Sequence, residues 1–148
     1  HLSIRRQRQM CIRDRIILGA FLSGLDGGLI YNSWPDMNGS FLPNDVGYND
    51  LINTQLLNNP SIIQFLHRVT AYFLLFFIII LNFLIIKNNH GTKNIILFDL
   101  AILIQIFLGI VTLLSGVEIK YASLHQLGSI FVLTSYLVIL YKNSKQKL

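Results

Sequence analysis

Two histidines stand inside apolar stretches of this 148-residue chain, where titratable side chains are uncommon. His67 lies near the start of one stretch, and His125 lies near the start of another. An ionisable side chain within hydrocarbon is a functional candidate by default, because it is costly to bury there. Imidazole is also the commonest metal ligand among side chains. The two histidines are therefore candidate ligands of one metal.

The residues three and four positions after each histidine are small, namely Thr70, Ala71, Gly128 and Ser129. Positions three and four apart share a helix face, so each imidazole has small side chains beside it. That space suits the edge of a flat macrocycle, and the pattern indicates a heme iron with two axial imidazoles. The alternative is that both histidines only pack, since small residues are common at helix contacts in membranes.

Three further polar side chains in the apolar stretches have expected roles. Arg68 has two interpretations: it pairs with a heme propionate, or it snorkels to the membrane interface. Gln105 is expected to hydrogen-bond to a neighbouring helix, and Asp99 is expected to reach interfacial water. A zinc site is disfavoured, because no third ligand of Cys, Asp or Glu lies at the depth of the two histidines.

The elements that must position these side chains are long apolar helices. Apolar residues make up 53% of the chain and charged residues 13%, whereas soluble proteins carry about 25% charged residues. A helix needs about 20 apolar residues to cross a bilayer. Three segments qualify: Phe65–Ile86, Ile95–Val117, and Leu124–Tyr141 within a helix over 122–141. The sequence predicts an all-α integral membrane protein with the lipid bilayer as its partner, and residues 16–25 as the end of a further spanning helix.

The distribution of positive charge predicts the topology. Lysines lie in the 87–93 connection and after the last span, so both regions are expected in the cytoplasm, together with the C-terminus. The connection over 26–64 contains four Asp and no Lys or Arg, so it is expected on the outer side. The helices of His67 and His125 then run in the same direction, and both histidines lie near the outer face. His90, in the cytoplasmic connection, is expected to be solvated.

The outer connection over 26–64 is long for a link between two helices. Its Gly and Pro residues make it irregular, and the plain interpretation is a disordered linker. Its aromatic content favours a folded cap over the outer helix ends, because disordered segments are poor in aromatic residues. The expected interfacial aromatics on this side are Tyr31, Trp34, Tyr48 and Tyr121.

Residues 1–15 have a different character from the rest of the chain. Residues 5–15, RRQRQMCIRDR, resemble the translation of a transposon-type sequencing adapter, so we expect an artefact and a chain cut from a longer gene. The alternative is a basic cytoplasmic arm or targeting segment. Without this segment the net charge is about +1, since seven Lys or Arg face six Asp or Glu. Nucleic-acid binding then has no support. Thiol redox chemistry has none either, because the one cysteine, Cys11, lies within this segment.

Four blocks of the sequence resemble the C-terminal half of the heme A synthase family. They are GLDGGLIYNSWP over residues 24–35, QFLHR over 64–68, LGIVTL over 108–113 and LHQ over 124–126. The resemblance covers nearly all of Ile16–Tyr141 in order and spacing. It implies half of an eight-helix protein, a four-helix bundle whose first helix is truncated here, over residues 16–148.

The resemblance also implies an activity. Members of the family oxidise the methyl group of heme O to the formyl group of heme A, by successive hydroxylation and loss of water, for cytochrome oxidase biogenesis. The C-terminal half holds heme b, and His67 and His125 match its two axial ligands. Heme O is expected as the substrate of the N-terminal half. The chain is expected to be an oxidoreductase fragment, inactive alone, in the cell inner membrane.

One departure from the family pattern concerns Gln64. The N-terminal half carries a Glu three residues before its first histidine, whereas this chain has Gln64, which cannot exchange a proton as a carboxylate does. This agrees with a cofactor-holding half. Asp36 also departs from the apolar residue expected after Trp-Pro, so the match of the following loop is less clear.

Two other functions stay open. A b-type cytochrome anchor subunit that exchanges electrons with quinone also needs paired intramembrane histidines, but it does not need a long acidic loop containing Trp-Pro. A non-enzymatic membrane scaffold would use the histidines for packing alone. Heme O synthase, cytochrome oxidase assembly factors and a second copy of the chain are the candidate protein partners.

Overall fold

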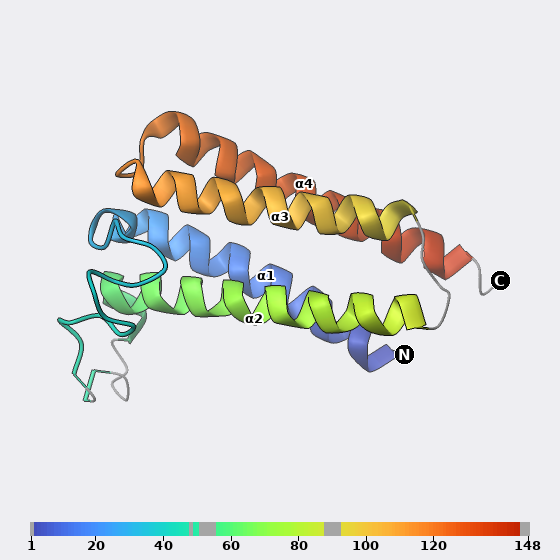
Figure 1. The fold of residues 1–148 in the computed structure, drawn as a ribbon, viewed down its shortest axis with the longest axis horizontal. Coiled ribbons are helices and arrows are strands. Elements are labelled where there is room, and N and C mark those ends of the chain that lie inside the picture. The colour runs from blue at the N-terminus through green and yellow to red at the C-terminus, as the bar shows by residue number, and fades with distance from the viewer. Residues whose placement is uncertain (1, 48, 51–55, 88–92, 146–148) are drawn as a thin grey trace. The chain divides into compact units, whose positions relative to one another are not determined.

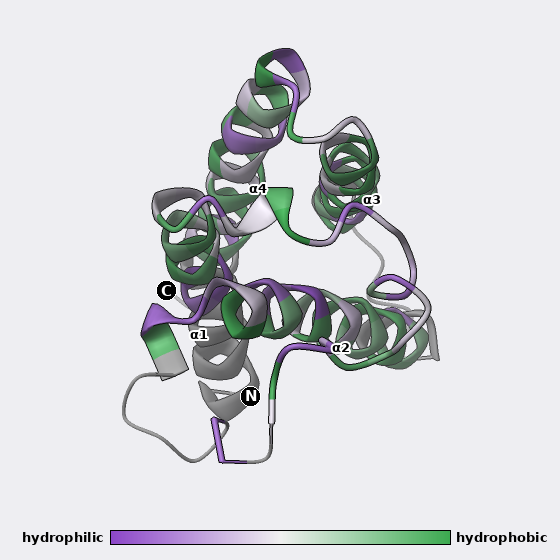
Figure 2. Cartoon of the chain, turned by 90° about the vertical axis from the view of Figure 1, so that its left-hand side faces the viewer, coloured by the Kyte–Doolittle hydropathy of each residue, from purple (hydrophilic) through white to green (hydrophobic). Residues whose placement is uncertain are grey.

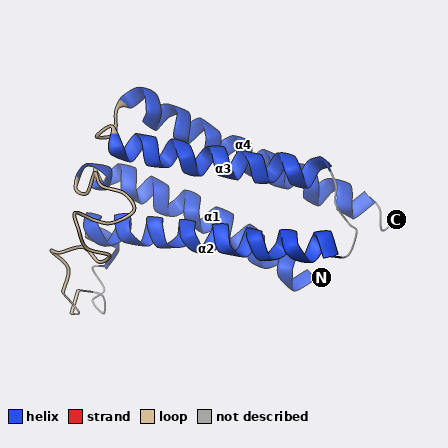
Figure 3. Cartoon of the chain, in the orientation of Figure 1, coloured by secondary structure: helices blue, strands red, loops and turns tan. Residues whose placement is uncertain are grey.

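The computed structural model describes residues 2–47, 49–50, 56–87 and 93–145, and all regular structure in these ranges is helical (Figure 3). The helices in chain order are α1 (Leu2–Gly24), η1 (Gly27–Leu29), η2 (Leu56–Asn58), α2 (Pro60–Lys87), α3 (Lys93–Leu114) and α4 (Ile119–Lys145), as Figure 1 shows. One isolated bridge joins Met37 and Ser40 in the loop before α2. The all-α prediction is confirmed.

Three helices are long and apolar enough to cross a membrane. The candidate spans are Pro60–Leu84, Ile95–Leu114 and Ile119–Lys142, and apolar residues predominate along α3 in Figure 2. Each span contains most of one apolar segment predicted from the sequence. The chain is therefore a multi-pass helical membrane protein.

The helix α2 begins at Pro60, five residues before the predicted Phe65. Asn59 caps it, because its Oδ1 accepts hydrogen bonds from the amides of Ser61 at 2.9 Å and Ile62 at 3.3 Å. Asn is a preferred N-cap residue, and proline is favoured at the first helical position because its fixed φ suits a helix. The cap and the proline, rather than the apolar run alone, mark this start of the helix.

The helix α3 ends at Leu114, three residues before the predicted Val117. The amide of Gly116 donates to the carbonyl of Leu113 at 3.1 Å, and Gly116 takes a φ of 69°. Val117 follows with a φ of 62°, which is unusual for a β-branched residue. Two successive left-handed residues reverse the chain, and α4 begins at Ile119 rather than at the predicted 122.

The helix α1 is continuous from Leu2 to Gly24. Residues 2–15, predicted to be adapter-derived, thus share one helix with most of the predicted helix end over 16–25. Arg13 and Asp14 form an exposed ion pair at 3.6 Å in this part. The adapter origin of residues 1–15 stays a prediction.

The chain forms two compact units. The first comprises His1–Leu74 and Leu113–Val117, and the second comprises Leu75–Thr112 and Glu118–Leu148. The first unit buries Tyr31, Met37, Ile62 and Ile63. The first two belong to the connection between α1 and α2, termed the outer loop after the side of the membrane predicted for it, and the other two belong to the first turn of α2. The loop residues after α1 therefore share a core with the start of α2.

The second unit has a core between α3 and α4. The rings of Phe98 and Tyr136 lie 5.9 Å apart between centroids, and both side chains are buried. Asp99 accepts a hydrogen bond from Asn82 Nδ2 at 2.9 Å, and its contact with interfacial water stays a prediction. This bond joins α2 to α3, as expected where hydrocarbon supplies no other partner.

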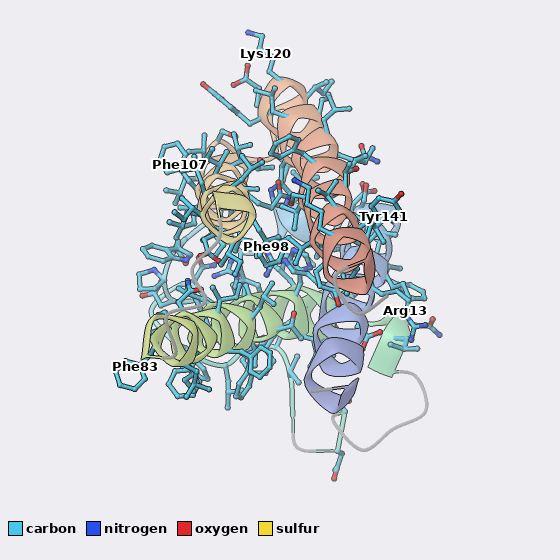
Figure 4. All side chains as sticks on the ribbon, turned by 90° about the vertical axis from the view of Figure 1, so that its right-hand side faces the viewer. Arg13, Phe83, Phe98, Phe107, Lys120 and Tyr141 are labelled. Atoms are coloured by element: carbon cyan, nitrogen blue, oxygen red, sulfur yellow. The ribbon has the colours of Figure 1, made fainter. Side chains whose placement is uncertain are left out.

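Phe98 and Phe107 provide a matched test of which face of α3 packs inside the protein. Phe98 is 5% exposed, whereas Phe107 is 65% exposed and points away from the helices in Figure 4. Phe98→Ala should destabilise the chain by about 3 kcal/mol, since it opens a cavity beside Tyr136. Phe107→Ala should cost less than about 1 kcal/mol, because lipid replaces the ring. Thermal unfolding in micelles, followed by circular dichroism, measures both, and equal losses would contradict this packing.

Candidate functional site

His125 is held by the backbone of the neighbouring helix. It is the seventh residue of α4, and its ring is half-buried. The Nδ1 atom lies 3.1 Å from the carbonyl oxygen of Gln105 on α3. Because a carbonyl only accepts, Nδ1 carries the proton, and the lone pair of the neutral ring is at Nε2. A metal-bound histidine shows the same arrangement, with the other ring nitrogen donating to a carbonyl or carboxylate.

Two glycines allow α3 and α4 to approach at this point. A Cβ at Gly109 would lie 2.9 Å from His125 Cε1 and 3.5 Å from Nε2, so only glycine leaves room for the ring. A Cβ at Gly128 would overlap Gln105 Oε1. The Gln105 Nε2 atom donates to the His125 carbonyl at 2.7 Å, which confirms the predicted hydrogen bond across helices. The space predicted for a macrocycle edge at Gly128 is thus taken, on this side, by an amide.

His67 also lies against a glycine of another helix, within the first unit. It is the eighth residue of α2, is half-buried, and lies against Gly19 of α1, where a Cβ would be 3.5 Å from its Cε1. The hydroxyl of Thr70 donates to the His67 carbonyl at 3.0 Å. Each unit therefore contains one imidazole seated on a glycine of the preceding helix.

The remaining small residues predicted beside the rings are in the two helices as expected. Ala71 is half-buried on α2. Ser129 on α4 donates its hydroxyl to the Gln126 carbonyl at 2.7 Å, so it is turned back to its own helix. Contacts of these residues with heme stay predictions.

Arg68 binds the outer loop. Its Nη1 donates to the carbonyls of Ser33 at 2.9 Å and Asp36 at 2.7 Å, and its Nη2 donates to the carbonyl of Tyr31 at 2.8 Å. These bonds surround the cis peptide between Trp34 and Pro35. Neither interpretation of Arg68 from the sequence included this role, because the loop carbonyls leave no signal in the sequence.

Gln64 strengthens the same attachment. Its side chain is 1% exposed, and Nε2 donates to the Tyr31 carbonyl at 2.9 Å. Arg68 donates to the same oxygen, so the two side chains, one helical turn apart on α2, hold one point of the loop. Gln64 therefore acts here as a hydrogen-bond donor, which a carboxylate at this position would not be.

A second polar network, centred on Asp45, joins two parts of the loop to the start of α2. The Tyr31 hydroxyl donates to Asp45 Oδ1, and Ser61 Oγ donates to Asp45 Oδ2 at 2.6 Å. Burial, and then the hydrogen bond and charge of Asp45, raise the pKa of Tyr31. Desolvation alone would raise the pKa of Asp45, but the hydrogen bonds from Ser61 and Tyr31 lower it below its ordinary value.

The outer loop also reaches the turn between α3 and α4. Asn32 Nδ2 donates to the carbonyls of Gly28 and Leu113, each at 3.0 Å. A Cβ at Gly28 would lie 2.9 Å from a methyl group of Val117. The loop therefore packs on Val117, the residue with the unusual left-handed backbone, within the first unit.

The fold and these residues define a multi-pass helical membrane protein with one half-buried imidazole near the N-terminal end of each of the helices α2 and α4. Within the described residues there is no group of three or more His, Cys, Asp or Glu side chains that could hold a metal ion. A heme iron requires only two such ligands, because the porphyrin supplies the other four. The donors present fit a heme.

The chain belongs to the cytochrome oxidase assembly protein family, whose model matches residues 10–137. It is 77% identical over 130 residues to the heme A synthase of Pelagibacter ubique (strain HTCC1062), and the matched region covers 88% of this chain and 39% of that protein. It is 42% identical to the heme A synthase of Rickettsia felis over 81% of this chain and 36% of that protein. The chain thus spans well under half the length of these relatives. No solved structure matches it.

The site residues that the sequence did not reveal are those that lie beside a histidine ring or accept a hydrogen bond from it through the backbone. Gly19 and Gly109 seat the two rings, and the Gln105 carbonyl binds His125. A glycine within an apolar helix costs up to about 1 kcal/mol relative to alanine, but the sequence does not say which segment, if any, approaches it, as Gly24 with no neighbour within 4 Å shows. His90 and Tyr48 lie outside the described residues.

Arg68→Gln should release the loop around Trp34. A hydrogen bond to a charged group contributes about 1.5–3 kcal/mol, so loss of even one raises the open population about tenfold or more. Trp34 is the only tryptophan, so its emission reports this loop alone. We expect a red shift and about tenfold faster proteolysis between 33 and 47, with Arg13→Gln as the control. An unchanged rate would mean that these bonds do not hold the loop.

The pH range over which the loop is held follows from two pKa shifts. The lowered pKa of Asp45 gives stability that is complete above its ordinary value of about 3.9 and is lost as the pH falls below it. The raised pKa of Tyr31 gives stability that is complete below about 10 and is lost as the pH rises further. Trp34 emission should be constant between these limits. Ser61→Ala should move the acid transition to higher pH, and an unmoved transition would refute this network.

Proposed function

We propose that this chain is the heme b-binding, electron-relaying part of a heme A synthase, with His67 and His125 as the axial ligands of one heme iron. Family membership and relatives named heme A synthase support the proposal. The observation that carries it is the hydrogen bond from His125 Nδ1 to the Gln105 carbonyl. It selects the tautomer whose Nε2 lone pair binds iron.

The positions of the two histidines along their helices support a shared heme. His67 is the eighth residue of α2 and His125 is the seventh of α4. At 1.5 Å per residue, both lie about 10 Å from the start of their helices. Because one span separates α2 from α4 in the chain, alternating topology gives the two helices the same direction. Two rings at the same depth on parallel helices suit two faces of one porphyrin.

A bis-histidine heme supplies one-electron transfer when bound. The residues of this chain would hold and orient it. The Gln105 carbonyl fixes the ring of His125, and the ring of His67 packs beside Gly19 of α1. Gln64 and Arg68, on either side of His67 in α2, hold the loop through the Tyr31 carbonyl. Arg68 retains further N–H donors that suit a heme propionate.

The oxidation of heme O to heme A is assigned to the complete protein, and this chain alone is proposed to be inactive. In this proposal Gln64 takes no proton and serves only to bind the loop. The lysines at 142 and 145 support a cytoplasmic C-terminus in the cell inner membrane. Heme O synthase and oxidase assembly factors are proposed partners, because a free heme intermediate is poorly soluble.

A reduced-minus-oxidised absorption spectrum tests the proposal on the 148-residue chain, expressed with ample heme and purified in detergent. The wild type should show a low-spin b-type spectrum with one heme per chain. His67→Ala and His125→Ala should each abolish the low-spin signal, since each removes one axial ligand. His90→Ala is the matched control and should leave the spectrum unchanged.

Two results would contradict this proposal. One is a helical, monodisperse wild-type chain that takes up no heme. The other is a low-spin spectrum that survives either of the two critical substitutions, which would return that histidine to a packing role.

A further inference from the structure

We propose that Gln105 is a positioning residue for His125, and that its side-chain amide sets the register of α3 against α4 at which Nδ1 meets the Gln105 carbonyl. The value of this register for iron ligation rests on the proposed function. The register itself does not, because it is a property of the two helices alone.

Two hydrogen bonds cross between the same two residues in opposite senses. Gln105 Nε2 donates to the His125 carbonyl at 2.7 Å, and the Gln105 carbonyl lies 3.1 Å from His125 Nδ1. Each residue thus offers its side chain to the backbone of the other. Rotation or sliding of either helix would lengthen both bonds, so the pair defines a single register.

Both acceptors are carbonyls within helices. Gln105 is the thirteenth residue of α3 and His125 is the seventh of α4, so each carbonyl already accepts an amide one turn onward in its own helix. A carbonyl oxygen has a second lone pair, which the side chain of the other residue uses. In hydrocarbon no water competes for that lone pair, so the cross-helix bond persists.

Two glycines make room for the two side chains. A Cβ at Gly109 on α3 would strike the His125 ring, with Nδ1 at 3.4 Å. A Cβ at Gly128 on α4 would overlap Gln105 Oε1 and lie 3.4 Å from Cδ. Each helix therefore lacks a side chain where the other helix inserts one. This reciprocity separates the pair from an incidental contact of one polar side chain.

Gln105 has no direct part in binding iron and acts through His125. Its side chain is 8% exposed, and Oε1 accepts no hydrogen bond from the described residues. Gln105→Met therefore removes a single hydrogen bond while keeping an unbranched side chain of similar length. Gln126→Met is the matched control, because Gln126 is exposed on α4 next to His125.

Nitrogen-15 NMR of histidine-labelled, heme-free chain in micelles tests the register directly. His125, assigned by comparison with His125→Ala, should be in the Nδ1–H tautomer in the wild type and in Gln126→Met. In Gln105→Met the same signals should shift toward a mixture of tautomers. A wild-type His125 in the Nε2–H tautomer, or a Gln105→Met spectrum equal to the wild type, would overturn the proposal.

Heme transfer to an excess of apomyoglobin provides the second readout. Loss of an outer partner of a metal ligand weakens binding about 10–100-fold, so Gln105→Met should release heme faster by a factor in that range. Gln126→Met should release heme at the wild-type rate. Equal rates for all three proteins would refute a positioning role. A wild type that binds no heme but shows the predicted tautomers would refute the proposed function and leave the register established.

Gly128→Ala provides a variant that keeps Gln105. The added methyl group displaces the amide oxygen, so the tautomer shift and faster heme release should reappear, although alanine favours the helix. Gly24→Ala is its control, because nothing lies within 4 Å of that Cβ. If Gln105→Met fails to fold, Gly128→Ala tests the proposal in its place. If Gly128→Ala and Gly24→Ala then show the same His125 tautomer and the same rate of heme release, the proposal is overturned.

Discussion

A polar group within hydrocarbon must find its hydrogen-bond partner inside the protein, and this constraint shapes the structure around His125. For His125 the partner is the carbonyl of Gln105, reached only because Gly109 has no side chain. The same requirement joins Asn82 to Asp99 deeper in the second unit. A histidine bound in this way has one defined tautomer before any metal arrives, which lowers the cost of ordering on binding.

In the outer loop, a charged side chain satisfies the backbone carbonyls. Arg68 lies eight residues after the start of α2 and binds three loop carbonyls, so its charge is shared by the dipoles of the Trp34–Pro35 turn. Hydrogen bonds from Tyr31 and Ser61 to Asp45 add a second attachment of the loop to α2. A segment that looks like a linker by its glycines and prolines is thereby attached to the helix that carries His67.

The sequence was sufficient for the helical membrane class, because twenty-residue apolar runs have one stable solution in a bilayer. It placed helix ends less well: Pro60 and Leu114 differ from prediction because caps and left-handed turns, not hydropathy, end helices. The bond made by Gln105 was predictable, since an amide in hydrocarbon needs a partner. The roles of Gly19 and of the loop carbonyls were not, because they depend on how distant segments pack.

The central claim is that His67 and His125 bind the same iron. Pulsed EPR of the oxidised, heme-loaded chain with nitrogen-15 histidine counts the axial histidine nitrogens on each heme iron, whether the iron is low-spin, as expected in the wild type, or high-spin, as expected in the variants. The account predicts two axial histidine couplings in the wild type and the loss of one in each of His67→Ala and His125→Ala. A single histidine coupling in the wild type, or two couplings that persist in either variant, would contradict it.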